Sequence, residues 1–372
     1  MADEKRIVLT GGLSGGHTFP LIAVARTIKA RAGTSTSFLY IGSRGQFEER
    51  SMTAEGIPVR YILSGKIRRY FSWQNFIDPF KVPIGFLQSL WHLFLYMPDV
   101  VFAKGGSVSV PVCLAAWVLH IPILIHDSDA VPGRANALLA KFASRIALAY
   151  PSAQAYFPPR KTALTGNPVR TEILSGDRSS ADARFGFTAD RPVVVVLGGS
   201  LGAQALNRAI VRVLPQLLRE AYVLHQTGQN NYQEVVMLAG EMGVKAGHEG
   251  YVPVPFLEAA DLGLAFARAD LIVSRAGAGS IAEIAACGKP AILVPLSSAA
   301  NDEQRKNAYD VAHVGGALVL EESNLGEHIL FSKIDELLRN PELRSSMGQN
   351  VRVFHNPMAA DMIAEGVLSL AD

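Results

Sequence analysis

Cysteine is scarce in this sequence, which excludes a small extracellular fold held together by disulfides. Only Cys113 and Cys287 occur among the 372 residues, each in an apolar stretch with the pattern of a buried helix. We therefore expect two reduced thiols in hydrophobic cores, as in a protein of a reducing compartment. The first residues pass from charged side chains directly into a short apolar run, so no export signal is expected.

An excess of one charge sign is also missing. The chain has 35 Lys and Arg against 33 Asp and Glu, which gives a formal net charge of +2. Nucleic-acid-binding proteins normally carry a strongly basic surface, so nucleic acid is not an expected partner.

Long uninterrupted apolar runs do not occur either. Residues 82–98 and 108–125 are apolar, but each is shorter than the roughly 20 residues of a membrane-spanning helix. Proline and polar side chains interrupt both stretches. Residues 108–125 are predicted to form a buried helix and a strand. Residues 82–98 fit either a core helix or part of a surface that contacts a membrane.

The chain is instead rich in glycine and in short apolar runs. Continuous hydrophobicity in short runs is typical of parallel strands that are buried on both faces. Helical patterns alternate with these runs, so the sequence predicts a doubly wound parallel α/β fold. The ten expected strands lie within residues 6–12, 37–43, 100–106, 122–128, 145–150, 192–200, 222–228, 271–277, 291–297 and 316–320.

Two glycine-rich segments follow the first apolar run of each half of the chain. They are "GGLSGGH" at residues 11–17 and "GGSLGAQ" at residues 198–204. The polar residues 165–191 between the halves are expected to be loop-like. The sequence therefore predicts two Rossmann-like domains, residues 1–168 and 169–356.

Both glycine-rich segments are candidate phosphate sites. A turn without Cβ atoms brings backbone N–H groups close to an anion, and the dipole of the following helix adds positive potential. Neither segment has the Lys-Ser or Lys-Thr pair of a P-loop or the G-x-G-x-x-G spacing of dinucleotide sites. Tight packing between helix and strand is the alternative explanation for each.

A third cluster of small residues, "SRAGAGS" at residues 274–280, precedes Glu283 within a helical pattern. A carboxylate at such a place can accept hydrogen bonds from both hydroxyls of a ribose. A glutamate on a solvated helix face explains the spacing equally well.

Eight motifs taken together resemble the MurG glycosyltransferases, which attach N-acetylglucosamine to lipid I during peptidoglycan synthesis. In the family's order, they are "TGGLSGGHTFP", "PDVVFAKGGSVS", "IPILIHDSDAVPGRAN", "TGNPVRTEIL", "VLGGSLGAQALN", "HQTG", "SRAGAGSIAEIAACGKPAILVP" and "DEQRKNA". The resemblance covers nearly the whole chain. It implies the glycosyltransferase B fold, with a cleft between two Rossmann-like domains and a last helix, in residues 357–372, that packs back on the first domain.

The resemblance also implies a UDP-N-acetylglucosamine donor, bound mainly by the second domain. Arg170 and Ser200 are implied near the diphosphate, Leu257 at the uracil, Glu283 at the ribose and Gln304 at the sugar hydroxyls. The full implied UDP-sugar set is Ser14, Gly15, Gly16, Asp129, Arg170, Ser200, Leu257, Ala278, Gly279, Ser280, Glu283 and Gln304.

On the acceptor side, His17 is the leading candidate for the general base. A neutral imidazole suits removal of the proton from the attacking hydroxyl, although a capping or ligand-binding role is the alternative. The other candidate bases are His126, Asp127 and Asp129. The implied acceptor-side residues are Gly105, Gly106, Ser107 and Asp127. Arg170 and the helix dipoles suit stabilisation of the departing UDP, so we expect an inverting transfer without metal or cofactor.

The chain departs from the family pattern mainly on this acceptor side. It has Leu13, Ser14 and Ser107 where the family has glycine, threonine and tyrosine, and Arg305 where a second glutamine often follows. Residues 126–129 read "HDSD" where the family has "HEQN". Leu13 adds bulk to the first glycine-rich segment. Asp129 places a carboxylate where the family has an amide.

Cationic and aromatic residues alternate between residues 60 and 81. The residues expected to contact a membrane are Lys66, Arg68, Arg69, Phe71, Trp73, Phe76, Phe80 and Lys81. Cations beside exposed aromatic rings suit binding to anionic lipid, at about 1 kcal/mol per cation. Because lipid I is membrane-anchored, we expect a peripheral protein on the cytoplasmic face of the membrane.

Three other functions stay open at this point. A transferase of the same fold can use a different lipid acceptor. A hexosamine epimerase would convert the nucleotide sugar without any acceptor. A non-catalytic module would bind UDP or membrane without transfer.

Overall fold

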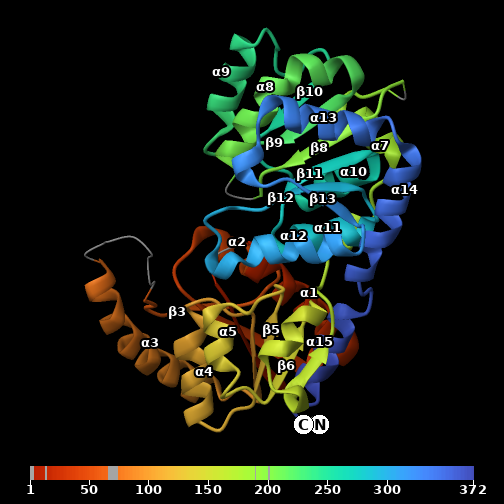
Figure 1. Cartoon of the computed structure of the whole chain (residues 1–372). Helices are drawn as coiled ribbons and strands as arrows, with labels where there is room; N and C mark the ends of the chain where they lie inside the picture. The colour runs from red at the N-terminus through yellow and green to blue at the C-terminus, as the bar shows by residue number, and fades with distance from the viewer. Residues whose placement is uncertain (1–3, 13–14, 66–73, 189, 200–201) are drawn as a thin grey trace. The chain divides into compact units, whose positions relative to one another are not determined.

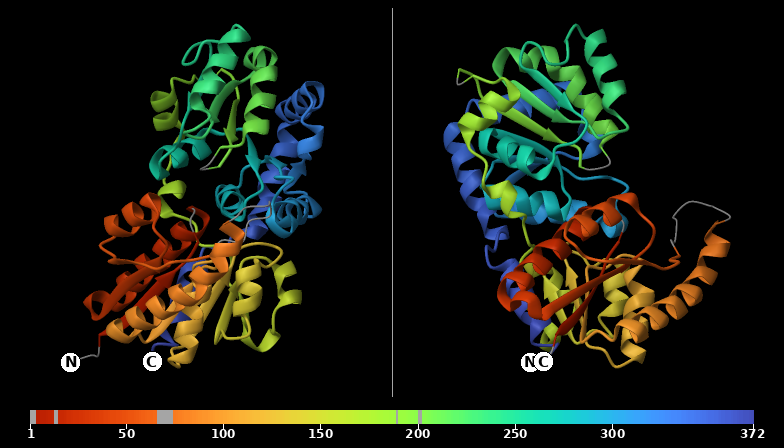
Figure 2. Two further views of the ribbon diagram at one scale, coloured as in Figure 1. Left: turned by 90° about the vertical axis from the view of Figure 1, so that its left-hand side faces the viewer. Right: turned by 180° about the vertical axis from the view of Figure 1, so that it is seen from behind.

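The computed structural model describes residues 4–12, 15–65, 74–188, 190–199 and 202–372 (Figure 1). The chain divides into two compact units, Met1–Pro168 with Asn356–Asp372 (unit 1) and Val169–His355 (unit 2). Each unit contains one parallel sheet with helices on both faces (Figure 2). The predicted class of two doubly wound parallel sheets is therefore confirmed.

Unit 1 contains a seven-stranded sheet in the order β3-β2-β1-β4-β5-β6-β7. Its strands are β1 (Lys5–Thr10), β2 (Thr36–Gly42), β3 (Val59–Tyr61), β4 (Val100–Ala103), β5 (Ile123–Asp127), β6 (Arg145–Leu148) and β7 (Thr162–Leu164). Its helices are α1 (Gly15–Ala32), α2 (Gln46–Ala54), α3 (Gln74–Tyr96), α4 (Ser109–Val118), α5 (Arg134–Leu139) and α15 (Ala359–Leu368).

Helices α1 and α15 cover one face of this sheet. Leu21, Val24, Ala25 and Ile28 on α1 are buried at the i, i+3, i+4, i+7 spacing of an amphipathic helix. They share one core with alternate residues of the central strands and with α15. The last helix of the chain is thus part of unit 1.

Unit 2 contains a six-stranded sheet in the order β10-β9-β8-β11-β12-β13. Its strands are β8 (Val193–Leu197), β9 (Tyr222–Gln226), β10 (Tyr251–Val254), β11 (Leu271–Arg275), β12 (Ala291–Val294) and β13 (Ala317–Val319). Its helices are α6 (Thr171–Leu174), α7 (Arg178–Phe185), α8 (Gln204–Glu220), α9 (Tyr232–Glu241), α10 (Ala259–Arg268), α11 (Ala278–Cys287), α12 (Glu303–His313), α13 (Glu327–Leu338) and α14 (Pro341–Asn350).

The polar segment 165–191 is not the loop that its composition predicted, because it contains α6 and α7. Asp177 caps α7 by accepting a hydrogen bond from the backbone N–H of Ser180 (2.9 Å), and Gly186 ends the helix with φ +72°. The side chains of Ala181 and Phe185 are buried. Two buried side chains and two caps are enough to order a helix of otherwise polar residues.

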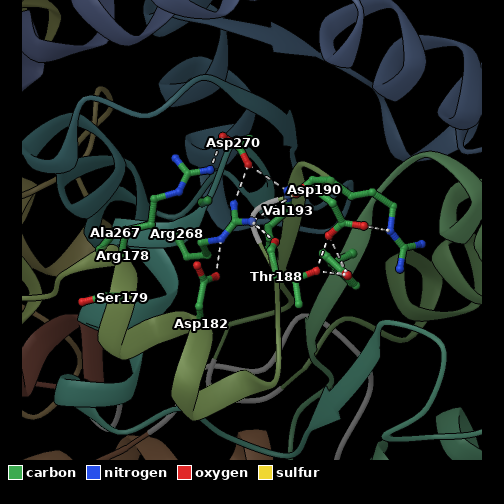
Figure 3. A network of polar contacts seen from close by, with 12 residues as sticks. Arg178, Ser179, Asp182, Thr188, Asp190, Val193, Ala267, Arg268 and Asp270 are labelled. Carbon is green, nitrogen blue, oxygen red and sulfur yellow. Dashed lines mark hydrogen bonds and ion pairs between the residues drawn. The ribbon is translucent and has the colours of Figure 1, made fainter.

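Arg268 ties this segment to the sheet of unit 2 (Figure 3). Its guanidinium is fully buried and donates to Asp182 on α7, to Asp270 (2.8 Å) and to the carbonyls of Thr188 (2.9 Å) and Arg191 (3.0 Å). Each of its three nitrogens has an acceptor, so the buried charge is compensated on every side.

Both cysteines are free thiols in helices, as predicted, but only Cys113 is fully buried. Residues 108–125 form α4 and β5, as predicted. Among the described helices, none is long and apolar enough to cross a membrane.

Candidate active site

In a doubly wound sheet, ligands bind beyond the carboxyl ends of the strands at the point where the strand order reverses. This switch point lies between β1 and β4 in unit 1 and between β8 and β11 in unit 2. Most of the described residues predicted from the motifs follow these or neighbouring strands. We therefore describe two half-sites, one in each unit.

In unit 1 the half-site is built around closely packed glycines. Gly105 and Gly106 directly follow Lys104, at the carboxyl end of β4, with φ near +84° and +85°. A Cβ atom on Gly106 would lie 2.6 Å from the Cα of Gly12, and one on Gly12 would lie 3.1 Å from the ring of His17. Glycine is therefore required here for close packing between backbone segments and against a ring.

His17 is the third residue of α1 and is half-buried. Burial, and secondarily the positive charge of Lys104, lowers the pKa of His17 to about 4. The imidazole is therefore neutral at pH 7 and has a lone pair available to accept a proton.

At the carboxyl end of β5, His126 and Asp127 are buried. His126 is hydrogen-bonded through Nε2 to the carbonyl of Gly166 (3.1 Å), which gives it a structural role. Asp127 accepts hydrogen bonds from Asn136 (3.1 Å) and from the backbone N–H of Asp129 (3.2 Å). Burial and the neighbouring Asp129 raise the pKa of Asp127 to about 6.

Two residues of this half-site were not predicted from the motifs. Lys104 follows the apolar run of β4, and its side chain is buried near His17. Asn136 on α5 fixes Asp127 and lies against Gly105, where a Cβ would be 2.8 Å from its Oδ1. A charged residue at the end of an apolar strand was the available signal for Lys104, whereas a helical asparagine gives no such signal.

The half-site of unit 2 lies at the start of α11. Gly277 precedes the helix, and Ala278, Gly279 and Ser280 form its first turn, as the motif predicted. Glu283, one turn later, accepts a hydrogen bond from Arg170 through Oε1 (2.9 Å), and both side chains are more than four-fifths buried.

This contact excludes the solvated-face alternative for Glu283. Burial raises the pKa of the Glu283 carboxyl, while the charge of Arg170 opposes the rise. Among the described residues, the one hydrogen bond of this carboxylate is to Oε1, so Oε2 can accept a hydrogen bond from a ligand hydroxyl.

Gln304 lies near the carboxyl end of β12 and accepts a hydrogen bond from the backbone N–H of Leu296 (3.1 Å). Arg275 and Glu322 were not predicted from the motifs either. They support the segment after β12 that contains Leu296 and Ser297. Arg275 contacts Glu322, whose other oxygen accepts from the hydroxyl of Ser297 (2.6 Å). An arginine at the end of the apolar strand β11 was the signal for this pair.

The remaining predicted residues divide between the two units. Leu257 follows edge strand β10, with a buried side chain. Gly15 and Gly16 begin α1, and Ser107 precedes α4. Leu13, Ser14, Lys66, Arg68, Arg69, Phe71, Trp73 and Ser200 lie outside the described residues, as do the side chains of Phe76 and Phe80. Lys81 on α3 is half-buried. In the described part of the chain, no three His, Cys, Asp or Glu side chains are grouped as a metal site.

Comparisons with known proteins agree with this arrangement. The glycosyltransferase family 28 N-terminal domain matches residues 7–148, and the glycosyltransferase family 28 C-terminal domain matches residues 193–363. A crystal structure of MurG from Acinetobacter baumannii superimposes with a TM-score of 0.75 at 28% identity, covering 98% of this chain and 99% of that one.

Two relatives carry the name UDP-N-acetylglucosamine–N-acetylmuramyl-(pentapeptide) pyrophosphoryl-undecaprenol N-acetylglucosamine transferase. The one from Lachnoclostridium phytofermentans is 40% identical over 90% of this chain and 91% of its own length. The one from Bacillus anthracis, numbered 2, is 37% identical over 91% of this chain and 93% of its own. The chain therefore belongs to the MurG family of glycosyltransferases, which confirms the family, the glycosyltransferase B fold and the enzyme class that its motifs predicted.

Proposed function

We propose that this chain transfers N-acetylglucosamine from UDP-N-acetylglucosamine to lipid I and so forms lipid II and UDP. The observation that carries the proposal is identity of 37–40% over nine-tenths of the chain with transferases named for this reaction. The two half-sites support it, because each offers the groups that one substrate of this reaction needs.

The donor is assigned to unit 2. The first turn of α11 directs backbone N–H groups and the positive end of its dipole toward a diphosphate. Arg170 adds a positive charge that is held in place by Glu283. Oε2 of Glu283 is assigned to the ribose hydroxyls. Gln304 is assigned to the sugar, Leu257 to the uracil, and Ser200 to the diphosphate.

The acceptor is assigned to unit 1, where His17 removes the proton from the attacking hydroxyl. Attack on the anomeric carbon breaks its bond to the UDP oxygen and inverts the configuration. Arg170 and α11 stabilise the negative charge that develops on UDP. The proposal involves no metal ion or cofactor, so activity is expected to survive EDTA.

The function is tested by measuring UDP release from UDP-N-acetylglucosamine with and without a lipid I analogue. Release is expected to require the analogue and to give one product with inverted anomeric configuration. Release with an unrelated lipid alone would favour a different acceptor. Conversion of the nucleotide sugar without an acceptor would identify an epimerase, and UDP binding without turnover would identify a binding module.

Replacement of Glu283 by glutamine is expected to weaken UDP binding roughly 10- to 100-fold, because hydrogen bonds to a charged acceptor are lost. Isothermal titration calorimetry measures the change. Glu234→Gln, which breaks a surface pair with Arg208, serves as the matched control.

A second ligand separates the ribose contact from a general disturbance of Arg170. Wild type and Glu283→Gln should bind 2′,3′-dideoxyuridine diphosphate with equal affinity, because that ligand lacks both hydroxyls. A tenfold difference with the dideoxy ligand would refute the assignment of Glu283 to the ribose.

We also assign the exposed side of α3 to contact with an anionic membrane on the cytoplasmic face. Leu87, Trp91 and Phe94 lie on one side of this helix and are 63%, 60% and 64% exposed. A helix that is buried on every side would cover these side chains, so their exposure supports membrane contact for residues 82–98 over an ordinary core helix. Trp117 on the neighbouring helix α4 is 53% exposed as well.

The double variant Trp91→Glu/Phe94→Glu is expected to bind phosphatidylglycerol vesicles at least about tenfold more weakly, because two apolar side chains can no longer enter the lipid. Vesicle sedimentation measures the bound fraction. Met237→Glu, an exposed apolar residue of unit 2, is the control and should bind like wild type. Undiminished binding by the double variant would contradict the assignment of α3.

A further inference from the structure

Lys104 is a buried cation at the switch point of unit 1. Its backbone N–H donates to the carbonyl of Thr10 (2.9 Å), which continues the pairing of β4 with β1. The residue is only 3% exposed, yet its ammonium makes no hydrogen bond or close ion pair with any residue that the structure describes. A buried charge without a direct partner is costly, so its presence calls for compensation by other charges.

The strand register places Lys104 in the middle of the half-site. Thr10 pairs with Ala103 and Ala103 with Ile125, so the next residues, Gly11, Lys104 and His126, form a row across three strand ends. A Cβ atom on Gly11 would lie 3.4 Å from the Cβ of His17 and 3.5 Å from that of Lys104. The missing side chain of Gly11 therefore allows Lys104 and His17 to approach each other.

Two carboxylates lie at the adjacent strand end. Asp127 is held by Asn136 (3.1 Å) and by the backbone N–H groups of Gly133 (3.3 Å) and Asp129 (3.2 Å). The last contact folds the chain back, so that Asp129 lies beside Asp127. Burial lowers the pKa of Lys104, whereas both carboxylates act to raise it. The groups that face Lys104 are thus His17 from α1, His126 and Asp127 from β5, and Asp129.

An anionic acceptor would meet repulsion from these carboxylates. If the acceptor carries a diphosphate, as in the proposed function on which this step rests, Asp129 in particular opposes its approach. Lys104 is a buried cation of this half-site, and its ammonium makes no hydrogen bond or close ion pair with the described residues. Its positive charge can therefore act on a bound anion.

We propose that Lys104 offsets the charge of Asp129 and supplies the positive potential that allows the diphosphate of the acceptor to bind in unit 1. Lys104 acts through its charge beside the glycine-rich segment 11–17 of unit 1 and is a positioning residue for the acceptor. The donor half-site does not depend on it.

The test compares Lys104→Met, Asp129→Asn and the double variant in steady-state assays with UDP-N-acetylglucosamine and a lipid I analogue. Lys104→Met is expected to raise the KM for the acceptor at least about tenfold, while the KM for the donor stays within about twofold. In the double variant the acceptor KM should return most of the way to the wild-type value, because the uncompensated carboxylate is gone. Asp129→Asn alone should lower the acceptor KM.

A second readout does not require activity. NMR titration of the free protein should show a higher pKa for His17 in Lys104→Met, because a nearby positive charge has been removed. This titration also tests the role of Lys104 if the wild type does not use lipid I. That failure would refute the proposed function separately.

The proposal would be overturned by equal increases in donor and acceptor KM, by an additive rather than compensating double variant, or by an unchanged His17 titration. If Lys104→Met does not fold, the acceptor KM of Asp129→Asn decides: a decrease supports the compensation and an increase overturns it.

Discussion

Replacement of His17 by alanine is expected to lower kcat by about 10²- to 10⁴-fold, the usual contribution of a general base. The side chain is neutral at pH 7 because burial and Lys104 depress its pKa, so it can accept a proton without first losing one. UDP release in the presence of the acceptor analogue measures the loss. Affinity for UDP should stay unchanged, because the donor is assigned to unit 2.

The pH dependence of kcat/KM distinguishes His17 from Asp127 as the base. The profile of kcat/KM reports the pKa of the free enzyme, and activity falls as the pH drops through the pKa of the base. With His17 as the base, activity should persist until the pH approaches about 4. With Asp127 as the base, it should fall near pH 6, because burial and Asp129 raise the pKa of that carboxyl to about 6.

Two variants complete this experiment. His328→Ala removes an exposed histidine of unit 2 and should leave the rate unchanged. Asp129→Asn tests the remaining candidate base. Retention of wild-type kcat by His17→Ala, together with a loss in Asp129→Asn, would transfer the role of base to Asp129.

Replacement of Arg268 by methionine is expected to lower the free energy of unfolding of unit 2 by about 3–5 kcal/mol, the range for a broken buried ion pair. The change leaves Asp182 and Asp270 without their buried cation and leaves the carbonyls of Thr188 and Arg191 without donors. Differential scanning calorimetry should show the melting temperature of unit 2 lowered by about 10 °C.

The matched control is Arg184→Met. Arg184 also bonds to an aspartate, Asp261, but its side chain is 57% exposed, so water replaces the lost contact. Its melting temperature should stay close to that of wild type. Equal shifts in the two variants would show that burial does not determine the contribution of Arg268.

Strands in the interior of each sheet could be predicted from the sequence, whereas most edge strands could not. All ten predicted strands are present, because a central parallel strand is covered on both faces and must be continuously apolar. The unpredicted strands β3, β7 and β10 are short and lie at sheet edges. Their residues are partly exposed or include a proline, so their pairing depends on the neighbouring strand and not on their composition.

The glycine-rich motifs located both half-sites in the sequence because parallel strands end at one edge of a sheet, where the backbone of the next segment is exposed to ligands. Glycine is needed at these positions because two backbone segments lie too close for a Cβ atom, as at Gly106 and Gly12. His17 ends one of these motifs and Glu283 follows another, so both were identifiable from the sequence alone.

The sequence by itself determined the family and the order of strands and helices. It also determined which residue types lie beside the glycine-rich segments of the two half-sites. All of these depend on local pattern. Only the tertiary structure decided which distant side chains share an environment. Arg170 and Glu283 are 113 residues apart and meet at 2.9 Å, and Lys104 after β4 lowers the pKa of His17 on α1. Electrostatic effects depend on distance and burial in space, and neither quantity is contained in the spacing of residues along a chain.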